Sequence, residues 1–520
     1  VMLLYVFAKR VTGSTLFATV TALLLTFDGM HFVQSRIATP EGFVVFFATL
    51  AVYAFYRFWI NSQVGERTHV AVPWWGFAAG AAGALLAGLG VALVGHTFAG
   101  FDAHATVVAT LYVASGFYLI VRYVLFVRFF GDGRRELSFG EGSYALRDAQ
   151  ATTLFAADGG TIDSRGKITR GTISQARSGA LRYDDEPLTI EYRRDGSVDY
   201  ETPAGGVTYA DDEIRDRRSA AVESGRSSRL WLVFFTVALG LLVSSKWYGV
   251  MGFGVSIFVL ALVFAQRTQT WRDLFGDGPT VWGNPRGFRI DGAVATILFV
   301  SATVYLMVWV PDLARNSPDP GEIHNVSDLV ERQHTMYEYH HNLRATHPYS
   351  SQWWEWPLDY VPVAYFYQDR RSNSNDTKGC CVYEITSMPN PVILWFGLFC
   401  VPFVAVLAWR ERNKAYALIV VTYLMQWLPW IGSPRLIFAY HFYVNIPLIC
   451  LCNAITLQWF WRWCRRRASL TWFGGLAAAS YVAAAAVMFL YFYPILADSP
   501  LTWAAWHQRM WFPTWIIGPG

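Results

Sequence analysis

The sequence predicts an all-α polytopic membrane protein. Hydrophobic residues make up 54% and aromatic residues 17% of the 520 residues, whereas only 15% are charged. The mean hydropathy is positive, and the apolar residues gather in long runs that short basic loops separate. This composition lies outside the range of soluble domains and is typical of a chain that crosses a membrane several times.

Eleven apolar runs are long enough, or nearly so, to cross the hydrocarbon core of a bilayer as helices. Residues Val1 to Arg10 resemble the tail of another helix and lack the charged start and cleavage site of a signal peptide. We therefore expect eleven spans and a partial first helix in a chain that begins within a longer protein. The runs cover residues 14 to 30, 40 to 59, 73 to 96, 105 to 127, 229 to 247, 250 to 266, 289 to 310, 391 to 409, 414 to 431, 437 to 458 and 470 to 494.

The basic residues predict which loops face the cytoplasm. If Lys9 and Arg10 lie inside, the successive turns bring every later basic cluster to the same side, as the positive-inside rule requires. Residues 311 to 390, the loop at 432 to 435 and the C-terminal tail then lie on the non-cytoplasmic face. We interpret the small net charge of +4 as topology information and predict no nucleic-acid binding. The later clusters are Arg57, Arg122 to Arg135, Arg267 to Arg272, Arg410 to Lys414 and Arg462 to Arg467.

Residues 131 to 228 interrupt the membrane pattern. Charge, Gly and alternating segments such as Leu188 to Tyr200 replace the apolar runs, and Asp195-Gly196 is a typical hairpin turn. We predict a small, β-rich cytoplasmic insertion followed by a charged helix near 211 to 227. The polar composition is also compatible with partial disorder.

The segment of residues 311 to 390 is too polar to span a membrane and too rich in Trp and Tyr to be a plain linker. At its centre stands the motif His347-Pro-Tyr-Ser-Ser-Gln-Trp-Trp-Glu-Trp-Pro357. Its three Trp residues could line a groove for carbohydrate or peptide, or form an interfacial helix lying on the membrane. The nearby His340 and His341, with His347, lack the regular spacing and acidic neighbours of a zinc site, so no metal site is predicted.

Charged residues also stand where the first two full spans meet. Asp28, Arg36 and Glu41 lie within the seventeen residues from Phe27 to Phe43. Charges at membrane depth normally face a bundle interior or a water-filled cavity. The three residues indicate either a direct role toward a substrate or an interfacial salt bridge between Arg36 and an acid.

Two further cationic positions return to the same predicted outer face. Lys246 stands at the end of an apolar run, after two Ser residues and before a Trp. Arg435 and His441 follow another apolar run, which prolines interrupt. Each alone is typical of a snorkelling or head-group-binding residue, or in the case of His441 of a packing residue. Together, the cationic sites predict a place for a lipid-linked phosphate whose tail stays in the bilayer.

Six sequence blocks resemble the protein O-mannosyltransferase family, the dolichyl-phosphate-mannose–protein mannosyltransferases, and most closely its bacterial members. The resemblance covers most of residues 1 to 60 and 229 to 520 and leaves 61 to 228 as an extra helix pair and the β-rich insertion. The blocks are Phe27-Asp-Gly-Met-His-Phe-Val-Gln-Ser-Arg-Ile-Ala, Ser244-Ser-Lys-Trp-Tyr-Gly, the motif from His347 to Pro357, Gln426-Trp-Leu-Pro-Trp, Ser433-Pro-Arg-Leu-Ile-Phe-Ala-Tyr-His-Phe and Arg509-Met-Trp-Phe-Pro-Thr-Trp515.

The resemblance implies a C-type glycosyltransferase fold in an integral membrane protein, of a bacterial plasma membrane or of the endoplasmic reticulum if the chain is eukaryotic. It implies a polyprenyl-phosphate-mannose donor, Ser or Thr hydroxyls of exported proteins as acceptors, and an inverting displacement without a metal. An acidic residue deprotonates the acceptor hydroxyl, and cations stabilise the departing lipid phosphate. The family's catalytic Asp-Glu pair is expected upstream of Val1, which is compatible with a truncated chain that is inactive alone.

The resemblance also implies roles for residues that this chain contains. Lys246 and Arg435 would bind the lipid phosphate. Asp28, Arg36, Glu41 and His441 would shape the site, and His347, Tyr349, Ser350 and Trp354 would contact the donor sugar or the acceptor.

Two alternatives stay open at this point. A non-catalytic partner subunit that retains the fold would explain the missing acidic pair. A transporter of a lipid-linked sugar would also need outer cationic sites, but it predicts internal repeats, which the sequence does not show. The predicted organisation is an N-terminal membrane part at 1 to 130, the insertion at 131 to 228, membrane helices at 229 to 310, the outer loop at 311 to 390, and a C-terminal membrane part with an outer tail at 391 to 520.

Overall fold

A computed structural model of the chain divides into two compact units. The first comprises Val1–Val52, Leu241–Ser256 and Arg332–Gly520, and the second Tyr53–Gly240 and Ile257–Glu331. The structure describes residues 1–61, 65–69, 74–98, 103–119, 134–138, 144–147, 153–162, 168–175, 181–183, 189–192, 198–202, 205–209, 230–247, 290–311, 326–370, 381–410, 413–433, 435–467 and 470–516.

Long apolar helices dominate both units. Among the described residues, five helices are long and apolar enough to cross a membrane, or six if a pair bent by 62° at Phe27 and Asp28 is one span. Four shorter apolar helices coincide with further runs that the sequence predicts. The run at 250 to 266 lies outside the described residues, so the total of eleven spans stays a prediction. The four shorter helices are Ala78–Leu93, Ala109–Leu119, Leu230–Ser245 and Val294–Val308.

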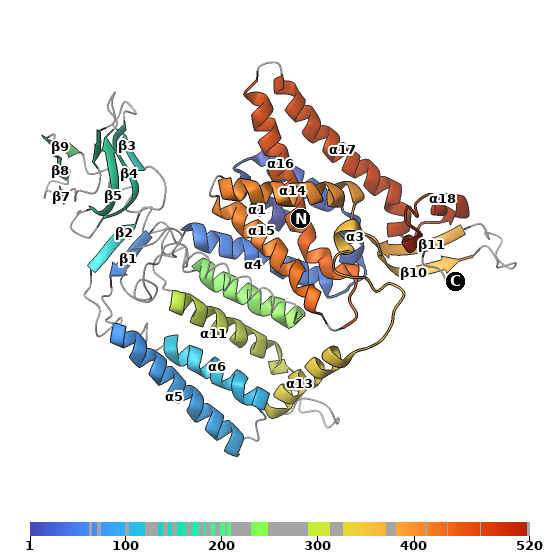
Figure 1. Ribbon diagram of the computed structural model, residues 1–520, viewed down its shortest axis with the longest axis horizontal. Helices are drawn as coiled ribbons and strands as arrows, with labels where there is room; N and C mark the ends of the chain where they lie inside the picture. Colours follow the sequence, from blue (N-terminus) through green and yellow to red (C-terminus); the bar gives the residue numbers. More distant parts are fainter. Residues whose placement is uncertain are drawn as a thin grey trace. The chain divides into compact units, whose positions relative to one another are not determined.

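Helix α16 (Ile446–Arg465) is the central element of the first unit. It packs against α14, α17 and α2, and 78% of the segment Ala439–Arg465 is buried, against 17% of Trp472–Leu496 in α17. Most of α17 is therefore exposed, and the helix lies at the edge of this unit (Figure 1). The helices of this unit are α1 (Met2–Thr12), α2 (Thr15–Thr26), α3 (Gly29–Arg36), the start of α4 (Glu41–Asn61), the end of α13 (Val326–Asn342), α14 (Pro391–Arg410), α15 (Lys414–Trp427), α16, α17 (Thr471–Leu496) and α18 (Trp503–His507), with short 3-10 turns η2 (Trp356–Leu358), η3 (Leu428–Gly432), η4 (Ala439–Asn445) and η6 (Pro513–Trp515).

Polar side chains at the helix ends explain where several helices begin. The side chain of Ser14 accepts a hydrogen bond from the backbone of Phe17 at the start of α2, and Asn413 accepts from Ala415 and Tyr416 at the start of α15. Such caps satisfy backbone N–H groups that have no partner within the helix.

A three-stranded sheet ties the polar loop to the C-terminal tail, and the all-α prediction missed it. Strands β10 (Val363–Asp369), β11 (Cys381–Ser387) and β12 (Leu501–Thr502) pair antiparallel in this order, with Val363 opposite Ser387 and Cys381 opposite Thr502. Cys381 is disulfide-bonded. A core cluster joins the sheet to α3, α17, α18 and η6, so the loop is a packed part of the unit. The cluster contains Val33, Val382, Met388, Phe492, Ile495, Leu496, Trp506 and Trp515.

In the second unit, α6 (Ala103–Leu119) packs against α5 (Trp74–Phe98) and α11 (Ile290–Val308). The ring of Tyr112 stacks on that of Phe299 at 5.0 Å, and the Tyr112 hydroxyl lies 3.0 Å from Thr303 Oγ1. Aromatic stacking and a hydrogen bond together fix the register of α6 against α11.

The strands predicted for residues 131 to 228 are confirmed between residues 134 and 209. Strand β7 pairs antiparallel with β8, with Thr189 opposite Glu201, and the predicted Asp-Gly turn lies outside the described residues. The predicted helix near 211 to 227 also lies outside them. The strands are β2 (Arg134–Ser138), β3 (Tyr144–Arg147), β4 (Thr153–Ile162), β5 (Ile168–Gln175), β6 (Leu181–Tyr183), β7 (Thr189–Tyr192), β8 (Val198–Thr202) and β9 (Gly205–Tyr209), and β1 (Gly65–His69) pairs with β2.

Candidate functional site

An ion pair between Glu41 and Lys246 forms the centre of the candidate site. Glu41 Oε1 and Lys246 Nζ lie 2.7 Å apart, and the two side chains are 11% and 31% exposed. Glu41 begins α4, where the helix dipole favours a carboxylate. Lys246 directly follows the helix Leu230–Ser245, and its backbone N–H donates to Leu242 O, where the same effect favours a cation.

A small pocket opens beside this ion pair. Apart from Glu41 and Lys246 it is lined by the aromatic residues Tyr440, His441 and Tyr443 of η4 and by aliphatic residues. The Lys246 ammonium lies 5.1 Å from the centre of the Tyr440 ring, close enough for a cation–π interaction. The pocket thus combines a charged end with an apolar and aromatic wall, as a site for the head of an amphiphilic ligand requires. The remaining lining residues are Val44, Val45 and Val444.

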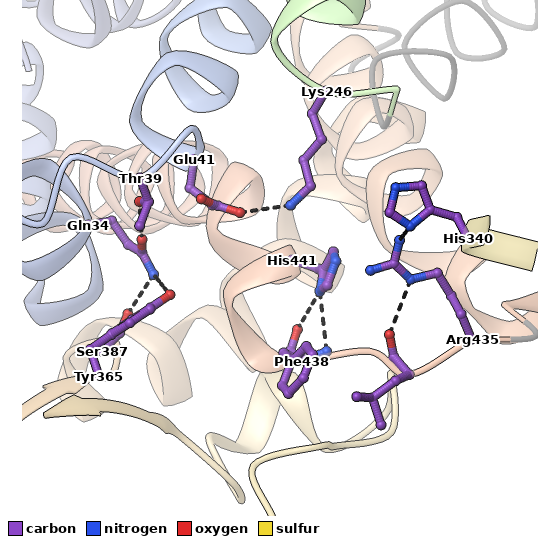
Figure 2. Close-up of polar contacts among 11 residues, drawn as sticks. Gln34, Thr39, Glu41, Lys246, His340, Tyr365, Ser387, Arg435, Phe438 and His441 are labelled. Atoms are coloured by element: carbon purple, nitrogen blue, oxygen red, sulfur yellow. Dashed lines mark hydrogen bonds and ion pairs between the residues drawn. The ribbon is translucent and has the colours of Figure 1, made fainter. Parts of the chain in front are cut away.

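Arg435 adds a second cation next to this pocket. Arg435 Nη1 lies 2.8 Å from Nδ1 of His340 in α13, and Arg435 Nε donates to the backbone O of Leu436 (Figure 2). Burial lowers the pKa of His340, and the positive charges of Arg435 and Lys246 lower this pKa further. His340 is therefore neutral at pH 7, and its Nδ1 accepts the hydrogen bond from Arg435. Both cations lie within electrostatic reach of one imidazole.

His441 is buried between the pocket and the aromatic motif. Its side chain is 5% exposed, and Nδ1 lies 3.2 Å from the backbone N and 3.0 Å from the backbone O of Phe438 (Figure 2). The ring stacks on Trp356 at 6.0 Å and meets Trp430 at 4.3 Å. These contacts fix the orientation of the imidazole, in agreement with the site-shaping role predicted for it, although its part in function stays a prediction.

The motif from His347 to Pro357 folds as turns, so the predicted interfacial helix is wrong for these residues. Ser351 N donates to Ile437 O, Trp427 Nε1 donates to Trp353 O at 2.8 Å, and Trp356 Nε1 donates to Ser351 Oγ at 3.0 Å. The first two bonds hold the motif against the segment just before η4 and against the end of α15.

The Trp residues of the motif do not form one flat surface. Trp356 is 2% exposed and belongs to the core, whereas Trp354 is 51% exposed. The buried Trp356 therefore does not line a groove, Trp353 is partly exposed, and Trp354 is the most exposed of the three rings.

The other predicted contact residues start the motif. The ring of the exposed His347 meets Phe438 at 5.3 Å, and its Nδ1 accepts from Tyr349 N at 3.2 Å. Ser350 is partly buried. Through Phe438, the start of the motif is connected with the segment that carries Arg435 and His441.

Asp28 and Arg36 contribute differently from what the sequence suggests. Asp28 is fully buried, and its carboxylate accepts from the backbone N of His31 at 2.8 Å and of Asn390 at 2.9 Å. It therefore begins α3 and fastens α3 to α14. Arg36 is exposed, and its guanidinium lies 4.8 Å from the centre of the Phe32 ring. Within the described residues, Arg36 forms no ion pair with an acid, so the predicted salt bridge is not seen there.

One polar network near the site was missed by sequence reasoning. Gln34 Nε2 donates to Tyr365 Oη and to Ser387 Oγ, both at 3.0 Å, and Gln34 Oε1 accepts from Thr39 Oγ1 at 2.8 Å (Figure 2). Tyr365 is the extra residue of a bulge in β10, and bulges commonly redirect a side chain. The network fixes the segment just before Glu41 against the sheet.

Groups of three or more metal-ligating side chains do not occur in the part of the chain that the structure describes. The candidate site offers two cations, one carboxylate, the imidazoles of His340 and His441, and aromatic walls. Such a set suits binding of a phosphate group with an apolar substituent.

Comparison with known proteins gives two family matches. Residues 325–515 match the C-terminal four TMM region of protein-O-mannosyltransferase, and residues 1–125 match dolichyl-phosphate-mannose-protein mannosyltransferase. Both matched segments carry parts of the candidate site, since Glu41 lies in one and Arg435 and His441 in the other.

Curated bacterial relatives carry the name polyprenol-phosphate-mannose–protein mannosyltransferase. That of Mycobacterium tuberculosis strain CDC 1551 is 25% identical over 397 residues, which cover 67% of this chain and 72% of the relative. That of Mycolicibacterium smegmatis is 26% identical, with 58% and 63% covered, and that of Corynebacterium glutamicum is 23% identical, with 55% and 58% covered.

Among solved structures, the Saccharomyces cerevisiae protein O-mannosyltransferase Pmt1-Pmt2 complex bound to the sugar donor matches with a TM-score of 0.43 and 12% identity. The match covers 99% of this chain and 79% of the yeast chain. The apolar helices and the family matches identify an integral membrane protein. From the two family matches and the named relatives, the chain belongs to the protein O-mannosyltransferase family and is of the bacterial type.

Proposed function

We propose that this protein transfers mannose from a polyprenyl-phosphate-mannose donor to Ser or Thr hydroxyls of exported proteins. The names of the bacterial relatives support a lipid-linked mannose donor and a protein acceptor. Membrane helices agree with a donor whose polyprenyl tail stays in the bilayer.

The observation that carries this proposal is the charge arrangement at the pocket. Lys246 and Arg435 supply two positive charges, and the carboxylate of Glu41 balances one of them. One positive charge is left in excess, which matches the single negative charge of a phosphodiester. We assign the donor phosphate to these two cations, with the aromatic wall of the pocket beside it.

The proposed reaction is an inverting displacement at the anomeric carbon. The acceptor oxygen forms a bond to this carbon while the bond to the phosphate oxygen breaks, and the electron pair remains on the lipid phosphate. The hydroxyl proton passes to an acidic residue that acts as the general base. Lys246 and Arg435 stabilise the charge that develops on the departing phosphate, an effect commonly worth about 2–4 kcal/mol for each well-placed donor.

Four residues of the motif are the proposed contacts of the donor sugar or the acceptor. His347, Tyr349 and Ser350 lie at its start, next to Phe438, and Trp354 offers an exposed ring that can stack on a sugar face. We place this loop on the non-cytoplasmic side, where an exported acceptor arrives. The placement is supported by the distribution of basic residues in the sequence.

A transfer assay tests the proposed function. Membranes containing the full-length protein are incubated with radiolabelled polyprenyl-phosphate-mannose and a Ser/Thr-rich peptide, and the anomeric configuration of the product is determined. We expect labelled peptide with inverted configuration. Lys246→Met should lower kcat/KM by at least about tenfold because it removes a charge-assisted contact. Lys9→Met, which removes an exposed Lys of α1, should leave it unchanged.

Two results would refute parts of this proposal. A full-length protein that binds the donor but transfers no mannose would instead support the non-catalytic partner subunit. Equal activity of Lys246→Met and wild type would remove Lys246 from the phosphate site.

A further inference from the structure

We propose that Glu41 is a specificity-determining residue that lets the site distinguish the monoanionic donor from the dianionic lipid phosphate that the reaction leaves behind. This inference rests on the proposed function, because it takes the ligand of Lys246 and Arg435 to be a lipid-linked phosphate. It adds a role for a carboxylate that a phosphate site would not otherwise need.

Glu41 occupies an unusual position for a carboxylate, because it lines a pocket assigned to an anion. A carboxylate that lines a phosphate pocket repels the ligand, and yet Glu41 lines this pocket and lies 2.7 Å from the cation assigned to the phosphate. The side chain is 11% exposed, so water screens its charge only in part. Its repulsion is therefore felt by any anion that enters the pocket.

The charged and titratable groups that face this place come from five elements. They are Glu41 of α4, Lys246 after the helix Leu230–Ser245, His340 of α13, Arg435 before η4, and Tyr440, His441 and Tyr443 in η4. At pH 8, where imidazoles are neutral and tyrosines protonated, the cluster carries one positive charge in excess.

The two lipid phosphates differ in charge. The donor is a phosphodiester with one negative charge, whereas the released lipid phosphate is a monoester with a second ionisation near pH 6 and therefore carries nearly two negative charges above pH 7. The Coulomb energy between Glu41 and the ligand is proportional to the charge of the ligand. Glu41 therefore weakens the binding of the product more than the binding of the donor, which favours release of the product after transfer.

The expected change in ligand affinity follows from the same proportionality between Coulomb energy and ligand charge. At a separation of about 7 Å and an effective dielectric constant between about 20 and 40, one unit of ligand charge changes affinity by a factor on the order of ten. Removal of the Glu41 charge should then tighten a monoanion about tenfold and a dianion about hundredfold, so that the ratio of the two affinities rises about tenfold.

A matched pair of ligands measures this ratio. A short-chain polyprenyl phosphate and its methyl phosphodiester share one lipid tail and differ by one charge. Their dissociation constants are measured at pH 8 and low salt with the full chain in detergent. Glu41→Gln should tighten both ligands and raise the monoester-to-diester affinity ratio about tenfold. Glu338→Gln, which removes an exposed carboxylate of α13, should leave the ratio unchanged.

Two more variants separate charge from geometry. Glu41→Asp keeps the negative charge and should keep the wild-type ratio, even if Lys246 moves. The double variant Glu41→Gln/Lys246→Gln removes both charges of the ion pair, leaves no unpaired lysine in the pocket, and restores one excess positive charge. Its monoester-to-diester affinity ratio should exceed that of Lys246→Gln alone by about tenfold, and this comparison serves as the test if Glu41→Gln does not fold.

The outcomes distinguish this inference from the proposed function. If Lys246→Met weakens both ligands but Glu41→Gln leaves the ratio unchanged, or weakens both ligands equally, Glu41 only positions Lys246 and the inference is wrong. If Lys246→Met leaves both affinities unchanged, the phosphate site itself is wrong.

Discussion

Asp359 should destabilise the protein at neutral pH, and its replacement by Asn should stabilise it. The side chain is 1% exposed, and among the described residues neither carboxyl oxygen has a hydrogen-bond partner. Burial raises the pKa of Asp359 well above its ordinary value, and the charge of Asp28 raises this pKa further. The folded protein therefore prefers the protonated acid, whereas the unfolded chain prefers the carboxylate.

The pH dependence follows from these two preferences. A carboxyl group with a raised folded-state pKa leaves stability intact below its unfolded pKa, which is near 3.8, and reduces stability as the pH rises from there to the folded pKa. Asn has the same shape without a charge, so Asp359→Asn should raise the free energy of unfolding at pH 7, by about 1–3 kcal/mol, the usual cost of a buried polar group without a partner.

The backbone of Asp359 requires a matched control. Its φ is 53°, in the left-handed region where Asn is also well tolerated. Asp498 shares this conformation, with φ 59°, but is exposed. Asp498→Asn therefore reports any gain from the backbone alone.

A thiol-reactive dye measures the melting temperature in detergent, because unfolding exposes the buried free cysteines. Asp359→Asn should raise the melting temperature more at pH 8 than at pH 5, while Asp498→Asn should show no such dependence on pH. A stabilisation that is equal at both pH values, or a loss of stability at pH 8, would refute this account. The reporter cysteines are Cys400, Cys450, Cys452 and Cys464.

Three substitutions test the structural roles found near the site by the same melting assay. Asp28→Ala should destabilise the protein by about 2–4 kcal/mol, because the backbone N–H groups of His31 and Asn390 lose their acceptor; a loss below about 0.5 kcal/mol would contradict this role. Trp356→Ala should cost about 3–5 kcal/mol because Trp356 is in the core. Trp354→Ala should cost less than about 1 kcal/mol and yet reduce mannose transfer; a larger effect on stability than that of Trp356→Ala would be inconsistent with the exposure of these two rings.

The helices were predictable from the sequence, because a long apolar run is compatible with few structures other than a helix. The expected spans at 391 to 409 and 470 to 494 agree with α14 and α17 within a few residues. The alternation in Leu188 to Tyr200 likewise predicted the hairpin of β7 and β8. Local pattern was sufficient in these segments because each element is specified by its own residues.

The sheet of β10, β11 and β12 was missed although its sequence carries a signal. Val363 to Tyr367 and Cys381 to Thr386 are rich in aromatic and β-branched residues, which favour strands. The high Trp and Tyr content of this segment is equally typical of a loop that contacts a ligand or a membrane. The pairing with Leu501 could not be inferred because that strand has two residues and lies more than a hundred positions away.

Members of the candidate site were identified from the sequence, but their pairing was not. Lys246 and Glu41 are 205 positions apart, and Arg435 and His340 are 95 apart, so only the tertiary fold shows which side chains contact one another. The contacts of Asp28 were likewise not predicted. Its carboxylate accepts from two backbone N–H groups, and its site-shaping role stays a prediction.

The central claim is that Lys246 and Arg435 hold the lipid phosphate, and equilibrium binding tests it without depending on catalysis. The dissociation constant of a short-chain polyprenyl-phosphate-mannose is measured in detergent for wild type, Lys246→Met, Arg435→Met and the control Lys9→Met. The account predicts that each of the first two variants binds about 10- to 100-fold more weakly, as expected for loss of a charge-assisted contact of about 1.5–3 kcal/mol, while the control binds like wild type. Wild-type affinity in both Lys246→Met and Arg435→Met would contradict it.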